Sequence, residues 1–321
     1  LMDITLHPNY AKGDGNDWIY LSYADQFNGS DSKSFTKIVR GRLRQVDSKW
    51  IWTAQQTIFE AKPEDYLGGD IHFGCKIVFD PRDPDIIFFG TGERGRDALA
   101  QSLSRPNGKV HRLHADGTVP TDNPFVNEKD AYPSIWSFGH RNPQGLAFDS
   151  LGNLWETEHG PRGGDELNLV LKGRNYGWPL VSFGINYSGA AFKTPWPDIA
   201  GKEVEAKDIV MPVDRWLPSI AACGLDVVRG DKFPEWKGDM LAGGLAGNNV
   251  DRIRLVPASS ELAPNMPAEL RMRVGEREEI VHGLGRVRDV VSAPDGFIYI
   301  VLNDPDKVVR LVPVVTPAAP K

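Results

Sequence analysis

The chain has 321 residues, of which 40% are hydrophobic, and it contains 33 Gly and 24 Pro. So many glycines and prolines indicate frequent turns and a β-rich protein rather than a helical one. Lys and Arg number 37 against 43 Asp and Glu, a net charge of −6, which argues against broad binding to nucleic acid or to an anionic membrane surface. No apolar run approaches about 18 residues, so we expect no membrane span.

One unit recurs along the chain: an apolar strand, a turn containing Pro, Asp or Gly, and a second strand rich in aromatic and aliphatic residues. The unit occurs five times, at residues 4–21, 77–89, 146–155, 225–241 and 290–300. Successive copies lie about 70 residues apart. This exceeds the roughly 40–50 residues of a minimal propeller blade and leaves room for inserted loops. Further strands are expected at residues 38–43 and 109–113.

The even spacing predicts an all-β fold built by radial repetition, with residues 1–315 forming a single β-propeller domain. A pair of β-sandwiches is the alternative architecture. Residues 316–321 are expected to form a C-terminal tail. The chain begins inside an expected strand, so we expect a cut or processed N-terminus. Cys75 and Cys223 are too few for a disulfide framework and leave open either one bridge or two buried thiols.

Two loops concentrate the side chains that can carry chemistry. Residues 139–142 and 158–168 hold charged, amide and imidazole groups on either side of an apolar segment, and such loops often carry function. The turn His159-Gly160-Pro161 can direct successive backbone carbonyls outward, which suits a hard cation such as calcium. An ordinary reversal of the chain is the alternative, since Gly-Pro turns are common.

Histidine and arginine supply further candidates. His72 stands just before a predicted strand, where it can act as a general base because the ordinary pKa of a histidine side chain lies near neutrality; a turn-capping histidine is the alternative. Arg286 and Arg288 share one face of a strand and can bind an anion there. Ordinary ion pairs, for example to Asp289 and Glu276, are the alternative for these arginines.

Other histidines and the familiar catalytic motifs carry less weight. His111 and His114 flank Arg112 on an outer strand and are expected at the surface. The sequence has no Walker loop, Rossmann fingerprint, HExxH, CxxC or Gly-x-Ser-x-Gly motif. Nucleotide-binding, zinc-enzyme and serine-hydrolase chemistries are therefore disfavoured.

Taken together, these motifs make the chain resemble the soluble pyrroloquinoline quinone (PQQ) dependent sugar dehydrogenases, and the aldose sugar dehydrogenase branch most of all. The similarity covers nearly the whole chain. It rests chiefly on residues 139–148, Gly-His-Arg-Asn-Pro-Gln-Gly-Leu-Ala-Phe, and residues 158–168, Glu-His-Gly-Pro-Arg-Gly-Gly-Asp-Glu-Leu-Asn. Ala246 lies where the glucose dehydrogenase branch has a lysine, which supports the aldose branch.

The resemblance implies a six-bladed β-propeller of four-stranded antiparallel blades, with PQQ over the central channel. The sequence begins where the family's second blade begins, so a first blade is expected to be absent or incomplete in this chain. The implied activity is oxidation of the C1 hydroxyl of aldose sugars to lactones, with electrons passed to an external acceptor. A periplasmic or secreted location is implied as well.

The resemblance also assigns roles to residues. His72 corresponds to the base that takes the proton from the sugar C1 hydroxyl as hydride passes to quinone C5. Arg141 and Asn142 correspond to groups near the quinone oxygens, with Arg141 stabilising developing negative charge. The carbonyls of Gly160 and Pro161 correspond to ligands of the catalytic calcium. The remaining implied cofactor contacts are His159, Ser219, Arg286 and Arg288, and a separate structural calcium is implied at Glu166 and the carbonyl of Tyr176.

Two other functions remain as alternatives. A quinone-free propeller could act as a binding module, although His72, Arg141 and the other implied site residues are intact. A calcium-dependent lactonase would need carboxylates converging on one central calcium, whereas the set visible in the sequence is rich in imidazole and guanidinium groups. Such a basic set suits an anionic cofactor.

Overall fold

The computed structural model describes residues 1–29, 32–190, 208–258 and 272–314. These ranges contain many strands and no α-helix. None of their helices is long and apolar enough to cross a membrane. The helices present are short 3-10 turns: η1 (Phe27–Gly29), η2 (Pro63–Asp65), η3 (Asp97–Gln101) and η5 (Pro234–Trp236).

The strands form antiparallel sheets in which each strand pairs with the next one along the chain. The first sheet contains β1 (Asp3–Leu6), β2 (Ile19–Gln26), β3 (Ser34–Val46) and β4 (Lys49–Phe59). The second contains β5 (Ile77–Asp80), β6 (Asp83–Thr91), β7 (Lys109–His114) and β8 (Ile135–Phe138). The third contains β9 (Pro143–Phe148), β10 (Leu154–Glu158), β11 (Asp165–Val170) and β12 (Asp214–Trp216).

Two further sheets complete the described part of the molecule. The fourth contains β13 (Ala222–Val227), β14 (Met240–Gly244), β15 (Asn249–Pro257) and β16 (Met272–His282). The fifth has three strands: β17 (Arg286–Ser292), β18 (Ile298–Asn303) and β19 (Lys307–Leu311). The first strand of every sheet begins one of the five repeated units seen in the sequence.

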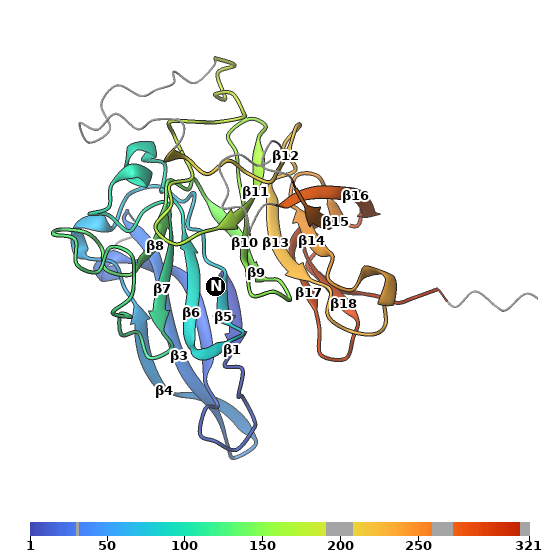
Figure 1. Cartoon of the computed structure of the whole chain (residues 1–321). Coiled ribbons are helices and arrows are strands. Elements are labelled where there is room, and N and C mark those ends of the chain that lie inside the picture. Colours follow the sequence, from blue (N-terminus) through green and yellow to red (C-terminus); the bar gives the residue numbers. More distant parts are fainter. Residues whose placement is uncertain (30–31, 191–207, 259–271, 315–321) are drawn as a thin grey trace, which may run out of the picture.

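The sheets are the blades of an all-β propeller and follow one another around the molecule from blue to red (Figure 1). The prediction of six blades is corrected, because the described residues form five sheets, one for each repeated unit. The prediction of four strands per blade holds for four of them; the fifth has three strands in its described part. The expected tail at 316–321 lies outside the described residues.

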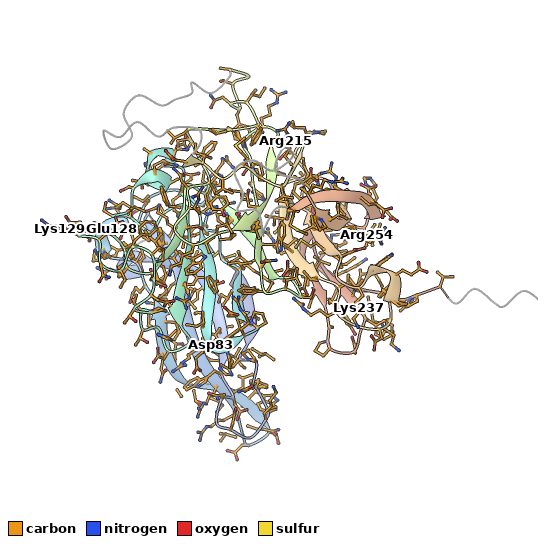
Figure 2. The ribbon with its side chains drawn as sticks, in the orientation of Figure 1. Asp83, Glu128, Lys129, Arg215, Lys237 and Arg254 are labelled. Atoms are coloured by element: carbon orange, nitrogen blue, oxygen red, sulfur yellow. The ribbon has the colours of Figure 1, made fainter. Side chains whose placement is uncertain are left out.

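The hydrophobic core lies between neighbouring sheets. Along β6, Ile87 and Phe89 pack into the cluster shared with the first sheet, whereas Ile86 and Phe88 pack into the cluster shared with the third. Successive side chains of a strand point to opposite faces, so an uninterrupted apolar run suits a strand covered on both sides. Charged side chains such as Glu128, Lys129 and Lys237 lie on the outside (Figure 2).

His111 corrects the expectation that this histidine lies at the surface. Its side chain is fully buried and stacks on Phe89, with the ring centroids 5.0 Å apart. Its Nδ1 lies 3.0 Å from Ser134 Oγ, and its Nε2 lies 3.1 Å from the Pro106 carbonyl oxygen. Burial lowers the pKa of His111 to about 3.

This lowered pKa predicts a loss of stability in acid. The unfolded chain binds a proton at His111 near pH 6.5, whereas the folded chain resists protonation down to about pH 3. The contribution of His111 is therefore present above pH 6.5 and falls by about 1.4 kcal/mol per pH unit below it. Urea unfolding at pH 6.5 and 5.0 measures the change, and a His111→Gln variant with the same pH slope as the parent would contradict the assignment.

Candidate functional site

A cavity of about 510 Å³ opens where the inner strands β5 and β9 begin. It brings together four residues singled out in the sequence: His72, Asn142, His159 and Arg288. A larger cavity of about 850 Å³ lies at the far end of the inner strands, near Phe79 and Phe148, and includes none of the predicted site residues. The smaller cavity is therefore the candidate site.

The loop before β5 holds His72 in a constrained conformation. His72 has a φ of 54°, in the left-handed region that non-glycine residues rarely adopt, and such conformations are concentrated at functional sites. Arg94 helps to hold this loop: it is buried, donates a 2.5 Å hydrogen bond to the Gly69 carbonyl and another to the Ile71 carbonyl, and stacks on Phe73. These contacts position the imidazole at the cavity.

His72 has a buried acidic partner. Its Nδ1 pairs with Oε1 of Glu93, whose side chain is 0% exposed. With Nδ1 engaged, Nε2 is the ring nitrogen left to exchange a proton with a bound molecule. Gly92 makes the approach possible, because a Cβ there would overlap the His72 carbonyl and come within 2.8 Å of Asn142 Oδ1.

Asn142 links the two loops predicted to carry chemistry. Its Oδ1 accepts a 3.1 Å hydrogen bond from the backbone N–H of Gly74, and its Nδ2 lies 3.3 Å from His159 Nδ1. The Nε2 atom of His159 is buried and has no hydrogen-bond partner within the described residues. Burial lowers the pKa of His159 to about 4, with Arg141 contributing to the decrease, so the ring is neutral near pH 7.

The far side of the cavity is formed by Arg288 and two thiols. Arg288 Nη1 lies 3.9 Å from Sγ of Cys223, and Cys75 lines the same cavity. Both cysteines are free. Of the two alternatives that the sequence left open, the structure therefore contains two thiols and not a disulfide bridge. Burial raises the pKa of Cys223 to about 11 and that of Cys75 well above its ordinary value, which keeps both thiols protonated near neutral pH.

A largely buried ion-pair cluster at the cavity joins three sheets, with the side chains of Lys76 and Asp289 17% and 22% exposed. Lys76 Nζ lies 2.7 Å from Asp289 Oδ2 on β17 and 3.3 Å from Asp3 Oδ1 on β1. Burial opposes the charge on Lys76, but the two carboxylates raise its pKa above the ordinary value. Ordinary ion pairs of Arg286 and Arg288 with Asp289 were the alternative considered from the sequence. In the structure Asp289 pairs with Lys76 instead.

The residues predicted to bind metal surround a second, very small cavity. Gly160, Pro161, Glu166 and Tyr176 all line this space of about 10 Å³, which Arg141 also lines. Arg141 Nη1 donates hydrogen bonds to the carbonyl oxygens of Gly160 (2.9 Å) and His159 (3.2 Å). A cationic side chain therefore already contacts a carbonyl that the sequence assigned to calcium.

Two other residues predicted to contact the cofactor, Ser219 and Arg286, do not line the 510 Å³ cavity. Ser219 Oγ donates to Asp165 Oδ1, and the same carboxylate oxygen accepts a 2.9 Å hydrogen bond from the Gly160 amide. Ser219 thus supports the Gly160 turn. Arg286 and Arg288 lie on either side of buried Val287, as strand alternation requires, but only Arg288 lines the cavity.

Similarity to known proteins identifies the family. Residues 1–310 match the family model described as Glucose / Sorbosone dehydrogenase. The chain belongs to this family. Aldose sugar dehydrogenase YliI of Escherichia coli (strain K12) is 38% identical over 306 residues, which cover 95% of this chain and 74% of that protein. Quinoprotein glucose dehydrogenase B of Acinetobacter calcoaceticus is 28% identical over 373 residues, covering 95% and 72%.

Solved structures of glucose/sorbosone dehydrogenase relatives share the fold. A crystal structure of a glucose dehydrogenase superposes with a TM-score of 0.81 at 34% identity and covers 97% of this chain and 82% of that one. The PQQ-bound form of aldose sugar dehydrogenase from Streptomyces coelicolor has a TM-score of 0.65 at 25% identity, covering 96% and 78%. The resemblance seen in the sequence is thereby confirmed at the level of the family.

Glu93 is the residue at the site that sequence reasoning missed. It lies in the segment Thr91-Gly92-Glu93-Arg94, which showed an acidic residue directly after a predicted apolar strand. That signal marks a polar group at a strand end, but it does not reveal that the group pairs with an imidazole 21 residues earlier. Only the packing of the loop before β5 against the end of β6 brings the two together.

Proposed function

We propose that this glucose/sorbosone dehydrogenase family member is a PQQ- and calcium-dependent dehydrogenase that oxidises the C1 hydroxyl of aldose sugars to lactones. Electrons pass to an external acceptor, and the protein works in the periplasm or after secretion as one propeller domain spanning residues 1–315. The observation that carries the proposal is the 510 Å³ cavity, which combines His72 with Asn142, His159 and Arg288.

The residues of the cavity suit an anionic cofactor. PQQ carries carboxylates, and a guanidinium such as Arg288 binds carboxylates with paired hydrogen bonds. The unpartnered Nε2 of His159 offers a further polar contact, since a buried polar atom is normally hydrogen-bonded. Arg286, exposed like Arg288 at the start of β17, would supply a second guanidinium group. When bound, PQQ supplies a quinone that accepts two electrons from the sugar.

His72 is the proposed general base. Its Nε2 would take the proton of the sugar C1 hydroxyl, because Nδ1 is already engaged by Glu93. The Glu93 carboxylate would stabilise the imidazolium formed in that step and hold the ring in place. Asn142 would then orient the reacting groups through its fixed amide, which is anchored by the Gly74 amide and by its contact with His159.

Calcium fits the structure less directly. The carbonyl of Gly160 accepts a hydrogen bond from the Arg141 guanidinium, so a calcium ion at Gly160 and Pro161 would require that side chain to turn away. Arg141 would then be free to stabilise negative charge on the cofactor side. The separate calcium proposed at Glu166 and the carbonyl of Tyr176 would lie at the same small cavity.

Reconstitution tests the proposal. The purified chain is mixed with PQQ, with and without calcium, and the quinone absorbance is followed after addition of glucose. We expect stoichiometric PQQ binding and bleaching of the oxidised quinone by the aldose only when calcium is present. A folded chain that binds no PQQ would contradict the proposal and favour a quinone-free binding module.

A further inference from the structure

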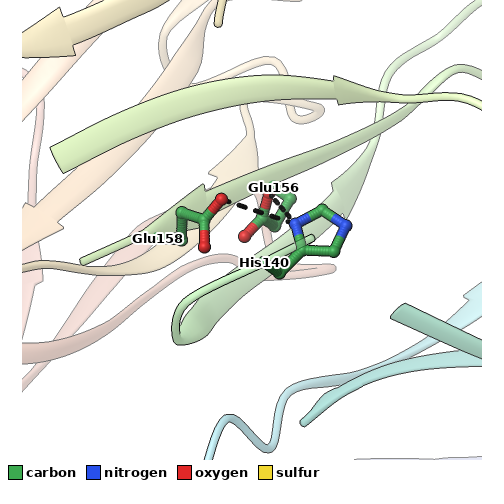
Figure 3. Close-up of side chains that lie close together, drawn as sticks. All are labelled: His140, Glu156 and Glu158. Atoms are coloured by element: carbon green, nitrogen blue, oxygen red, sulfur yellow. Dashed lines mark ion pairs between the residues drawn. The ribbon is translucent and has the colours of Figure 1, made fainter. Parts of the chain in front are cut away.

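A buried cluster behind the candidate site has no role in the proposed reaction. It consists of His140, Glu156 and Glu158, with Asn168 beside them, and all four side chains are at most 4% exposed. Glu156 and Glu158 are two residues apart on β10 and therefore share a face of the sheet. Figure 3 shows the imidazole of His140 directed toward both carboxylates.

The distances in this cluster suit a metal ion better than direct hydrogen bonds. His140 Nδ1 lies 3.5 Å from Glu156 Oε2 and 3.4 Å from Glu158 Oε1. Hydrogen bonds between an imidazolium and a carboxylate are about 2.7–2.9 Å long. Two ligands bound about 2.1 Å from a tetrahedral zinc ion lie about 3.4 Å apart. The observed separations match the second arrangement.

The orientation of His140 leaves its Nδ1 available. Its Nε2 lies 2.8 Å from Ser137 Oγ, which can accept the ring N–H. Nδ1 then carries a free lone pair, and it has no hydrogen-bond partner within the described residues. Metal-bound histidines commonly donate their other N–H to a nearby acceptor in this way.

The carboxylates are also oriented, and the imidazole of His140 is the one basic side chain that faces both of them among the described residues. Asn168 Nδ2 lies 3.2 Å from both Glu156 Oε2 and Glu158 Oε1, the same oxygens that face His140. Glu156 Oε1 is buried without a hydrogen-bond partner. Within the described ranges, no lysine or arginine forms an ion pair with either glutamate. Burying two carboxylates beside a single imidazole is costly, and a bound cation would lower that cost.

We infer that His140, Glu156 and Glu158 form a binding site for a divalent transition metal of the zinc class. One imidazole nitrogen with carboxylate oxygens favours such a metal over calcium, which prefers oxygen ligands alone. The site rests on this geometry and not on the proposed dehydrogenase activity. Its ligands differ from those proposed for calcium, although it adjoins them: Glu158 also lines the small cavity of Gly160 and Glu166, and Asn168 Nδ2 lies 3.1 Å from Glu166 Oε2.

The metal would brace the loop that carries the cofactor contacts. Glu158 Oε2, the oxygen turned away from His140, accepts hydrogen bonds from the backbone amides of Arg141 (2.5 Å) and Asn142 (3.3 Å). His140 itself precedes Arg141 in the chain. An ion at the cluster would therefore tie this loop to β10 from two directions and keep Asn142 in place at the cavity.

Metal titration of the full chain tests the inference. The protein is stripped with a chelator and titrated with Co²⁺ as a spectroscopic probe. We expect one equivalent to bind with visible absorption bands typical of nitrogen and oxygen ligation, to be displaced by Zn²⁺, and to resist excess Ca²⁺. The variant Glu156→Gln should weaken Co²⁺ binding at least about tenfold.

A matched control separates this site from surface binding. His282 and Glu279 form an exposed imidazole–carboxylate pair, with Nδ1 3.2 Å from Oε1, so Glu279→Gln should leave the tight equivalent unchanged. Should Glu156→Gln fail to fold, diffraction from the parent protein at the cobalt edge should give an anomalous peak between His140 and the two glutamates. Absence of that peak, equal binding by Glu156→Gln, or no tight equivalent in the parent would overturn the inference and leave a protonated cluster. PQQ reduction, assayed separately, reports on the proposed function.

Discussion

Replacing His72 with alanine is expected to slow the reduction of bound PQQ by an aldose about 10²- to 10⁴-fold, the usual contribution of a general base. PQQ binding should be retained, because Arg288, Asn142 and His159 contact the cavity independently of His72. Stopped-flow absorbance of the quinone after mixing with sugar measures the rate, and a separate titration of PQQ fluorescence measures binding. An unchanged rate would refute the role of His72 as base.

Glu93 provides the second arm of this experiment. The substitution Glu93→Gln keeps an oxygen near His72 Nδ1 but removes the negative charge that would stabilise the imidazolium. We expect a smaller loss of rate than in the His72 variant, together with a shift in the pH profile of the rate. The exposed His282 gives a control, since His282→Ala should alter neither quantity. A Glu93 variant with the parent's pH profile would show that Glu93 has only a structural role.

Replacing Lys76 with methionine is expected to lower the free energy of unfolding by about 3 kcal/mol, at the lower end of the range for a broken buried pair. The lower end applies because the Lys76 side chain remains 17% exposed. The substitution leaves Asp3 and Asp289 close to each other without their shared cation, and it removes a link between the first and fifth sheets. Urea unfolding monitored by tryptophan fluorescence measures the change.

A compensating variant makes this prediction specific to charge. Adding Asp289→Asn to Lys76→Met removes one of the stranded carboxylates, so the double variant should recover part of the lost stability. The Asp3 carboxylate keeps its 2.8 Å hydrogen bond from the Ile77 amide in both variants. A double variant less stable than the single one would mean that Lys76 acts through packing of its alkyl chain and not through its charge.

The sequence by itself determined the strand pairs and the family. The five repeated units became the pairs that open the five sheets, because apolar alternation and turn residues act over a few neighbouring positions. It also singled out His72, Asn142, His159 and Arg288, which the fold brings to one cavity. Their chemical roles stay predictions.

Tertiary structure decided the features that depend on residues distant in the chain. Strand alternation could not show that β7 is covered on the face of His111, since Phe59 of the first sheet provides that cover, with the ring centroids 5.2 Å apart. Other features likewise arise only when separate strands and loops pack together. They are the number of sheets, the pairing of His72 with Glu93, the contact of Arg141 with the Gly160 carbonyl, and the convergence of His140 with two glutamates. Local sequence patterns determine which segments form strands and turns. The burial of a side chain and its charged partners depend on the segments that pack against it in the folded protein.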